Sequence, residues 1–255
     1  MPTDRINGSL YTSIQNRVAT VEFGHPASNS FTSELLAHLS KELYALGENN
    51  NVSVIVLKSE GERAFCAGAS FDELVSISNL EEGKAFFSGF ANVINAMRSC
   101  GKIIVGRIHG KTVGGGVGLA SACDYVYATE AASIKLSELS IGIGPFVIAP
   151  AVERKIQKSG LAELSLNPTE WKNAYWAKEK GLFSKVFDSI VEMDKELDIH
   201  ISKLASYNPE ALAEMKRILW KGTEHWDTLL LERAAASGKL SLSSETKQTL
   251  DKFKK

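Results

Sequence analysis

The residues best placed to do chemistry lie in two clusters of small residues, each of which follows a β-rich stretch. The first cluster is Ala64–Ser70, and the second is His109–Leu119, which contains the run Gly114-Gly-Gly-Val-Gly118. Where a strand gives way to a turn and then a helix, backbone N–H groups point outward without an intrahelical partner. Such groups bind a negatively charged oxygen, and the helix macrodipole adds to the attraction. Both clusters are therefore candidate anion-binding turns.

Other kinds of site use similar residues. A nucleotide-phosphate loop has the order G-x-x-x-x-G-K-[ST], whereas here Lys111 and Thr112 precede the glycines, and the G-x-G-x-x-G pattern does not match either. Ser70, His109 and Asp124 are the residue types of a serine-hydrolase triad, but no G-x-S-x-G elbow surrounds Ser70. We expect His109 and Asp124 to be structural instead. For either cluster taken alone, the alternative to an anion-binding turn is that its glycines serve only tight packing or backbone conformations with positive φ.

The two clusters together, in this order, resemble the crotonase family, also called the enoyl-CoA hydratase/isomerase family. The similarity is continuous from about residue 64 to residue 186, and His25-Pro26-x-x-Asn29 resembles a weaker N-terminal motif. The residues that carry it are Ala64-Phe65-x-Ala67-Gly68-Ala69, Gly110-x-x-x-Gly114-Gly115-Gly116-x-x-Leu119-Ala120-x-x-Cys123-Asp124, Ser137-Glu138 and Gly181-Leu182-Phe183-x-x-Val186.

The resemblance implies an acyl-CoA thioester as the substrate. The thioester oxygen would lie between the backbone N–H groups of Ala69 and Gly115, which stabilise the enolate-like charge that develops as a proton leaves. Coenzyme A would pass along 67–71 as part of the substrate, with no separate cofactor and no metal. The residues expected to contact the CoA or the acyl chain are Ala67, Gly68, Ser70, Phe71, Gly114, Ile141 and Phe146.

One catalytic carboxylate is present where the similar hydratases use two. The first glutamate position, two residues beyond the triple glycine, is Gly118, and the second, twenty residues later, is Glu138. A single base can remove a proton at one carbon and return it at another, so we expect an enoyl-CoA isomerase with Glu138 as the base. Its pKa would have to be raised by a dry pocket. The candidate walls are Leu136, Leu139, Ile141, Ile143 and Phe146.

Two further departures from the family pattern bear on the reaction. The chain reads Gly144-Pro145-Phe146 where many hydratases have a Pro-Gly pair that helps to hold water, and Ser70 stands where an Asp is usual. Phe146 at this place would repel water, which favours isomerisation. Alternatively, it would reshape the acyl pocket for a branched substrate. The alternatives are an atypical enoyl-CoA or methylglutaconyl-CoA hydratase, a decarboxylase, or a non-catalytic acyl-CoA binder.

The elements that must position these residues alternate in type. Strands are predicted at 17–23, which alternates polar and apolar residues, at 52–57, which is nearly all apolar, and at 102–108. Helical spacing follows at Leu35–Leu46, with Thr32 as the predicted cap, and again at Phe86–Met97. Both helices would cover a sheet with one face, so the fold class is α/β. The resemblance specifies a crotonase-like spiral of ββα units.

Beyond about residue 150 helical periodicity dominates. Helices are predicted at 161–166, 174–180, 197–204 and 210–220. We expect residues 1–190 to form the crotonase-like acyl-CoA-binding core and residues 191–255 a helical oligomerisation region, since such proteins form trimers or dimers of trimers. The apolar residues available for that interface, or alternatively for covering the core, are Trp220, Trp226, Leu229, Leu230 and Leu231.

Composition narrows the partners and the compartment. Among 255 residues, 29 Lys and Arg oppose 30 Asp and Glu, for a formal net charge of −1, so no basic excess favours nucleic acid or a membrane surface. No apolar stretch reaches membrane-spanning length, and the N-terminus lacks a secretory layout. The three cysteines lack metal-ligand spacing and are expected to be reduced, with Cys66 and Cys123 as small core residues. These features favour a cytoplasmic protein.

Overall fold

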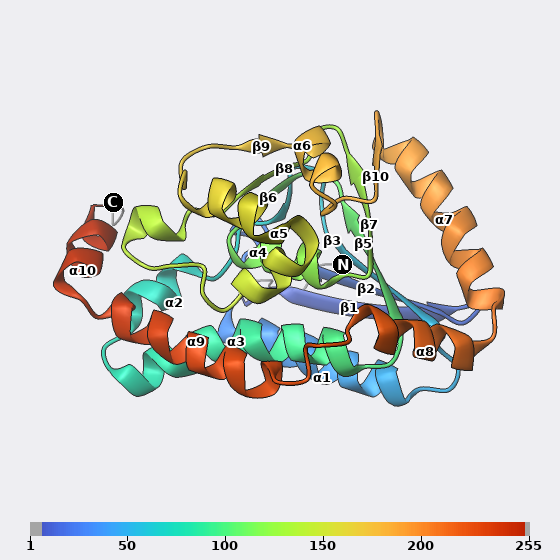
Figure 1. The fold of residues 1–255 in the computed structure, drawn as a ribbon, viewed down its shortest axis with the longest axis horizontal. Coiled ribbons are helices and arrows are strands. Elements are labelled where there is room, and N and C mark those ends of the chain that lie inside the picture. The colour runs from blue at the N-terminus through green and yellow to red at the C-terminus, as the bar shows by residue number, and fades with distance from the viewer. Residues whose placement is uncertain (1–6, 253–255) are drawn as a thin grey trace.

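The computed structural model describes residues 7–252, which form two β-sheets surrounded by helices (Figure 1). The larger sheet has the order β1-β2-β3-β5-β7-β10, in which β1 pairs antiparallel with β2 and the other neighbours are parallel. Its strands are β1 (Ser9–Gln15), β2 (Val18–Gly24), β3 (Val54–Ser59), β5 (Ile103–Ile108), β7 (Tyr125–Thr129) and β10 (Lys185–Phe187).

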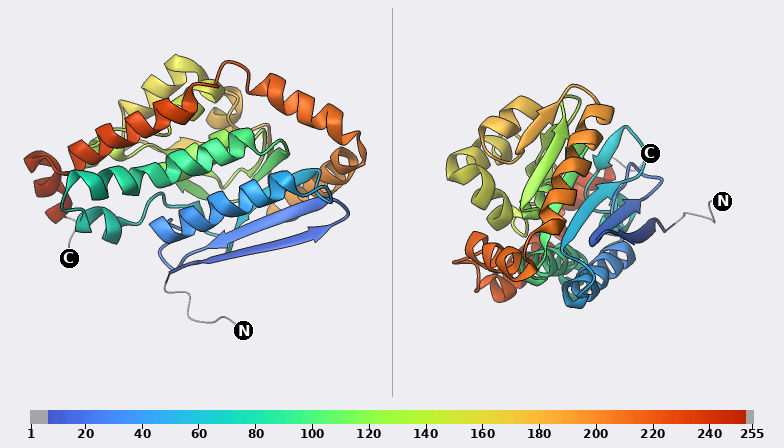
Figure 2. Two further views of the ribbon diagram at one scale, coloured as in Figure 1. Left: turned by 90° about the horizontal axis from the view of Figure 1, so that it is seen from below. Right: turned by 90° about the vertical axis from the view of Figure 1, so that its right-hand side faces the viewer.

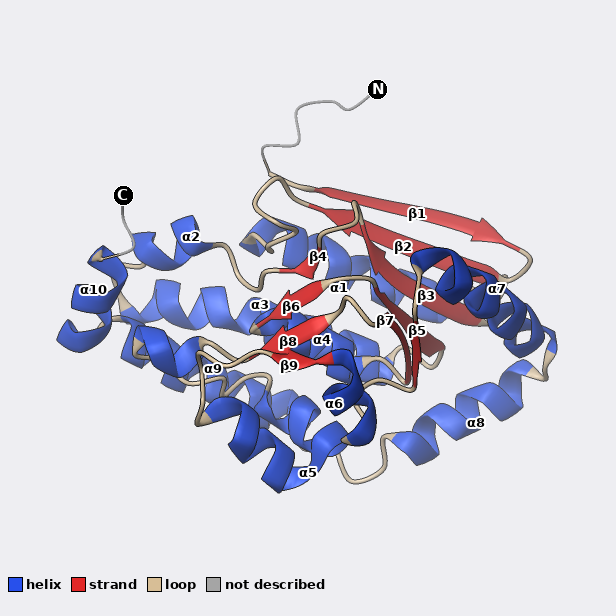
Figure 3. Cartoon of the chain, turned by 90° about the horizontal axis from the view of Figure 1, so that it is seen from above, coloured by secondary structure: helices blue, strands red, loops and turns tan. Residues whose placement is uncertain are grey.

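The smaller sheet has the order β4-β6-β8-β9 and lies beside the larger one (Figure 3). Its strands are β4 (Ala64–Cys66), β6 (Lys111–Val113), β8 (Ser133–Lys135) and β9 (Lys172–Asn173). The chain contributes β3, β5 and β7 to the larger sheet and, directly after each, β4, β6 and β8 to the smaller one. This repeated step is the predicted spiral. Because β4, β6 and β8 are mutually parallel, their carboxyl ends meet at one edge, where both glycine-rich clusters emerge.

Helices cover both faces of the larger sheet. On one face, α1 (Ser33–Glu48) and α3 (Leu80–Ser99) bury their apolar sides against residues such as Val21, Phe23 and Ile55. On the other, α7 (Ile190–Ser206) packs Met193, Leu197 and Ile201 on the sheet. The remaining helices are α2 (Phe71–Ser76), α4 (Gly115–Ala122), η1 (Glu138–Ile141), α5 (Ala149–Ser165), α6 (Ala174–Glu179), α8 (Pro209–Leu219), α9 (Trp226–Ser241) and α10 (Ser244–Asp251).

The predicted helix start at Thr32 is confirmed. Thr32 Oγ1 accepts a hydrogen bond of 3.2 Å from the backbone N–H of Leu35, which satisfies one of the free donors of the first turn. The three predicted strands correspond to β2, β3 and β5. Seven further strands within residues 7–252 were not predicted; six of them have only two to five residues and show no periodicity over so short a length.

The C-terminal helices pack on the body of the same chain. Helix α9 runs beside α3, which in turn lies beside α1 (Figure 2). Trp220, Trp226 and Leu230 are buried in the core that these helices share with the sheet. Of the residues considered for a subunit interface, these three therefore serve the alternative role of covering the core. The division at residue 190 and the oligomeric state stay predictions.

No helix in the described part of the chain is long and apolar enough to cross a membrane. The three cysteines are free and buried, which confirms the core position expected for Cys66 and Cys123.

Candidate active site

A cavity of about 470 Å³ opens at the edge where β4, β6 and β8 end. The segment after β4 contributes Ala67, Gly68, Ala69 and Phe71, and the segment after β6 contributes Gly114 and Gly115. The segment after β8 contributes Glu138 and Ile141, and Phe146 follows a few residues later. The topology of the smaller sheet thus gathers nine of the ten predicted site residues around one space.

Ala69 presents its backbone N–H on the side opposite Phe31. Phe31 pairs in parallel with Ala69, and it does so through the neighbours of Ala69. The N–H of Phe31 donates to Gly68 O at 2.8 Å, and the N–H of Ser70 donates to Phe31 O at 2.7 Å. In a parallel bridge of this kind the central residue points its own N–H to the opposite side. For Ala69 that side is the cavity.

Gly115 begins helix α4, so its N–H has no acceptor within that helix. The preceding Gly114 has φ of +53°, a conformation that side chains disfavour, and it turns the chain from β6 into the helix. A Cβ built on Gly115 would lie 2.3 Å from the ring of Phe90, so position 115 has room for no side chain. A Cβ built on Gly68 would lie 3.5 Å from Gly115 N. The two N–H groups predicted to bind the thioester oxygen therefore come from adjoining turns.

Glu138 places its carboxylate against the same turn. A Cβ built on Gly114 would lie 3.0 Å from Glu138 Oε1. The other oxygen, Oε2, is buried and has no hydrogen-bond partner among the described residues. Burial raises the pKa of the Glu138 carboxyl to about 7, because an apolar surrounding disfavours the charged form. A carboxylate with this pKa and a free buried oxygen is suited to accept a proton near neutral pH.

The turn that carries Glu138 is fixed by hydrogen bonds at both ends. The N–H of Ile143 donates to Glu138 O at 3.1 Å, and Gly142 ends η1 in the left-handed region with φ of +85°. Thr246 Oγ1, from helix α10, donates to Gly142 O at 2.9 Å. Helix α10 therefore supports the turn from outside the sheet, through a residue that sequence reasoning did not single out.

The apolar walls were predicted in part. Ile141, Ile143 and Phe146 line the cavity. Leu136 and Leu139 do not: Leu136 points into the main core, and Leu139 is exposed. Both predictions are wrong because η1 turns the chain at Glu138, so neighbouring side chains leave in different directions. Ile148, Leu74, Phe86, Phe87 and Phe90 supply the missing walls, and the three phenylalanines come from the helix that sequence reasoning assigned only to covering the sheet.

Ser70 is the predicted site residue that does not line the cavity. Its side chain is buried and accepts a hydrogen bond of 3.3 Å from the N–H of Glu73, which makes it the N-cap of α2. A serine is a preferred cap because its oxygen satisfies a free donor of the first turn. Ser70 therefore orients α2, and its direct contact with the substrate stays a prediction.

Gly118, the position of the absent glutamate, faces a wall. It is buried in α4, and a Cβ built on it would lie 2.4 Å from Ile148 Cγ2. Glu138 is the one carboxylate in the lining of the cavity among the described residues, and Lys135 is the one cation there. The Lys135 ammonium lies 4.6 Å from the centre of the Trp171 ring.

Ser70, His109 and Asp124 each bind other partners. His109 Nδ1 lies 3.3 Å from Arg107 Nη1, and burial lowers the pKa of its imidazole to about 4. Asp124 Oδ2 accepts from the N–H of Ile104 and from Lys216 Nζ, both at 2.7 Å. These contacts fit the structural roles expected for His109 and Asp124 and give no support to a triad.

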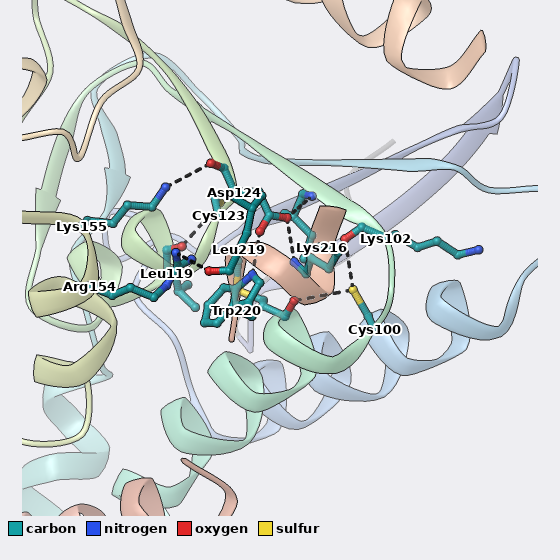
Figure 4. Close-up of polar contacts among 12 residues, drawn as sticks. Cys100, Lys102, Leu119, Cys123, Asp124, Arg154, Lys155, Lys216, Leu219 and Trp220 are labelled. Carbon is teal, nitrogen blue, oxygen red and sulfur yellow. Dashed lines mark hydrogen bonds and ion pairs between the residues drawn. The ribbon is translucent and has the colours of Figure 1, made fainter. Parts of the chain in front are cut away.

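Figure 4 shows how Asp124 joins segments that are distant in sequence. Trp220 Nε1 donates to Asp124 Oδ1 at 2.7 Å, and Lys155 Nζ donates to Asp124 O at 3.1 Å. Burial lowers the pKa of Lys155 to about 8. Arg154 stacks on the Trp220 ring at 3.8 Å. The cluster fastens the end of α8 and the start of α5 to the sheet and lies outside the cavity lining.

No group of three or more potential metal ligands occurs among residues 7–252.

Comparison with known proteins agrees with this geometry. The sequence model of the enoyl-CoA hydratase/isomerase family matches residues 13–254. The chain is 28% identical over 211 residues to the peroxisomal Delta(3,5)-Delta(2,4)-dienoyl-CoA isomerase of Arabidopsis thaliana, covering 77% of this chain and 74% of that protein. It is 30% identical over 221 residues to the 2,3-dehydroadipyl-CoA hydratase of Escherichia coli (strain K12), covering 84% and 83%.

A solved structure confirms the fold class. The crystal structure of an enoyl-CoA hydratase from Bacillus halodurans matches with a TM-score of 0.88 at 20% identity, covering 95% of this chain and 99% of the other. The predicted crotonase-like α/β fold is therefore correct.

Proposed function

The chain belongs to the enoyl-CoA hydratase/isomerase family, and from this premise we propose that it moves a carbon–carbon double bond along an acyl-CoA thioester, with Glu138 as its single base. The observation that carries the proposal is the pairing of one carboxylate, Glu138, whose buried Oε2 has no hydrogen-bond partner among the described residues, with a closed wall at position 118. Hydration requires a second group to activate water or deliver a proton, whereas proton transfer between two carbons requires one.

The reaction begins with the thioester oxygen between the N–H groups of Ala69 and Gly115. Glu138 removes a proton from C2 of a 3-enoyl thioester, and the electron pair of that C–H bond passes into an enolate conjugated with the C3–C4 double bond. The two N–H groups and the positive end of α4 stabilise the charge that forms on oxygen. The protonated Glu138 then returns its proton at C4, which leaves the double bond between C2 and C3.

The walls of the cavity support this choice. Phe146 and Ile148 lie on the side where a hydratase would hold its water, and both are apolar. Burial raises the pKa of Glu138 to about 7, which makes its carboxylate a stronger base toward the C–H bond than an ordinary carboxylate, and its protonated form then carries the proton to C4. The coenzyme A portion or the carbonyl would contact Ala67, Gly68, Phe71 and Gly114. Coenzyme A is part of the substrate, so the reaction needs no separate cofactor and no metal.

We place the enzyme in the cytoplasm as a homotrimer or dimer of trimers. The surface that supports self-association is not the one containing Trp220 and Trp226, which are buried within the chain. Met215, Ile218 and Leu219 instead form an exposed apolar stripe on α8, at the helical spacing that puts them on one face. Sedimentation of the protein and of Ile218→Lys tests this: the variant should dissociate.

Substrate comparison tests the reaction. The purified protein is offered 3-enoyl-CoA, 2-enoyl-CoA and 3-methylglutaconyl-CoA separately, and the products are identified by mass and ultraviolet absorbance. Interconversion of the first two without a change in mass is expected. Addition of water to the 2-enoyl or methylglutaconyl thioester without interconversion would establish an atypical hydratase instead. Loss of carbon dioxide would indicate a decarboxylase, and binding without reaction a non-catalytic protein.

A further inference from the structure

One hydroxyl group in the cavity has no assigned role. Ser237, on α9, lines the cavity, is 1% exposed, and its Oγ has no hydrogen-bond partner among the described residues. A buried hydroxyl without a partner costs free energy relative to an apolar side chain of the same size. An alanine at position 237 would complete the same wall without the cost of an unpartnered hydroxyl. The hydroxyl is therefore a candidate hydrogen-bond partner for a group on the ligand.

The packing of α3 against α9 locates Ser237 at the end of the cavity that lies away from Gly115. A Cβ built on Gly238 would lie 2.6 Å from the carbonyl carbon of Gly83, and further along the pair Asn95 Nδ2 donates to Trp226 O at 3.4 Å. The two helices are therefore antiparallel and in close contact, as Figure 2 shows. Ser237 lies level with the first turn of α3.

The other end of the same cavity contains the two N–H groups. Phe90, on α3, packs on Gly115. Seven residues separate Gly83 from Phe90, and a helix rises 1.5 Å per residue, so the two levels are about 10 Å apart along the helix axis. An acyl chain that starts at Gly115 and follows α3 would reach Ser237 several carbons beyond the thioester.

The wall between these ends contains no charge. Leu74, Phe86 and Phe87 line it. The charged side chains in the described lining, Lys135 and Glu138, both belong to the end near Gly114, whose N–H donates to Lys135 O at 2.9 Å. A carboxylate at the Ser237 end would be buried without a cation, which is costly. A neutral oxygen needs only the hydroxyl.

We infer that Ser237 is a specificity-determining residue that hydrogen bonds to a neutral oxygen, a hydroxyl or keto group, on the acyl chain about 10 Å from the thioester. The inference rests on the proposed function in one respect, namely that an acyl-CoA occupies the cavity. It defines the substrate class more narrowly than the family does: an oxygenated acyl chain, neither a plain hydrocarbon nor a dicarboxylate.

Binding of thioesters that cannot react tests the inference apart from the chemistry. Calorimetry compares saturated octanoyl-CoA and decanoyl-CoA with their ω-hydroxy and ω-carboxy derivatives, on the parent protein and on Ser237→Ala. For the chain length that reaches Ser237, the affinity ratio of the ω-hydroxy to the plain thioester should fall about 3- to 10-fold in Ser237→Ala, which is the usual effect of one hydrogen bond. The ω-carboxy derivative should bind more weakly than the ω-hydroxy one.

Ser53→Ala is the matched control, because Ser53 is also buried with an unpartnered Oγ and does not line the cavity. It should leave every ratio unchanged. Equal ratios in the parent and in Ser237→Ala, with normal binding of the plain thioesters, would overturn the assignment while leaving the proposed function intact. Tighter binding of the ω-carboxy derivative would overturn it too. Failure of every thioester to bind would overturn both proposals.

Discussion

Ile148 occupies the space that a side chain at Gly118 would need: a Cβ built on Gly118 would lie 2.4 Å from Ile148 Cγ2. Gly118 is the position at which similar hydratases carry their first glutamate. The missing glutamate and the position of Ile148 therefore belong to one packing arrangement, because Ile148 fills the space that a side chain at position 118 would occupy.

Restoring the glutamate alone should fail to create a hydratase. Gly118→Glu forces a longer side chain against Ile148 and buries a carboxylate, and we expect a loss of about 3 kcal/mol or more in the free energy of unfolding. Gly118→Glu combined with Ile148→Ala should recover part of that loss. Denaturant unfolding and a hydration assay on 2-enoyl-CoA measure both effects. A single variant that is as stable as the parent and hydrates would contradict the packing argument.

Removing the carboxylate of Glu138 should remove the base. Glu138→Gln keeps the shape of the side chain, so we expect the rate of isomerisation to fall about a hundred- to ten-thousandfold while binding of saturated acyl-CoA is retained. Glu179→Gln, which changes an exposed carboxylate, is the control and should keep full activity. If Glu138→Gln retained full activity, the site assignment would be wrong.

Activity should depend on pH through the same group. The base acts in its ionised form, and burial raises the pKa of Glu138 to about 7. Below pH 7, kcat/KM for isomerisation should therefore fall about tenfold per pH unit. A profile that stays flat down to pH 5 would mean that the carboxyl is not buried as the structure has it.

Stability should respond in the opposite direction. Glu138 binds its proton more tightly in the folded state, with a pKa of about 7, than in the unfolded chain, at the ordinary 4.5. Its contribution to the free energy of unfolding therefore falls as pH rises from about 4.5 to about 7, by up to about 3 kcal/mol. Glu138→Gln should be more stable than the parent at pH 8 and equal to it at pH 4, as measured by denaturant unfolding at the two pH values.

The ion pair in Figure 4 should matter for stability and not for chemistry. The side chains of Asp124 and Lys216 are each 2% exposed, so Asp124→Asn leaves a buried ammonium without a counter-charge and should cost about 3–5 kcal/mol. Asp227→Asn, at the exposed end of its pair with Arg98, should cost less than about 1 kcal/mol. Activity per folded molecule should be unchanged in both, and a loss of activity in folded Asp124→Asn would contradict the structural role.

Local sequence patterns were sufficient for the elements with long periodic faces. The spacing of Leu35–Leu46 located α1, and Thr32 located its start, because helical periodicity and a side-chain cap are both local. Strands such as β4 and β6 have three residues each, and only their pairing with one another makes them strands. Patterns within a single segment cannot reveal such pairing.

The site divides in the same way. Motif spacing placed Ala69, Gly115 and Glu138 together, since each motif follows a strand of the same parallel sheet. Motif spacing did not show that Ser70 caps a helix while its neighbours line the cavity, because capping depends on the direction in which α2 leaves the turn. Nor could it identify Ser237 and Thr246, which reach the site from helices whose packing is set by the rest of the fold.

The bond from Thr246 to Gly142 spans 104 residues of sequence. During synthesis, the turn that carries Glu138 therefore leaves the ribosome long before the hydroxyl that fastens it exists. A nascent chain can assemble both sheets and still lack a fixed base. Chemical competence is thus acquired late in the life of the growing polypeptide, after most of the structure that surrounds it has formed.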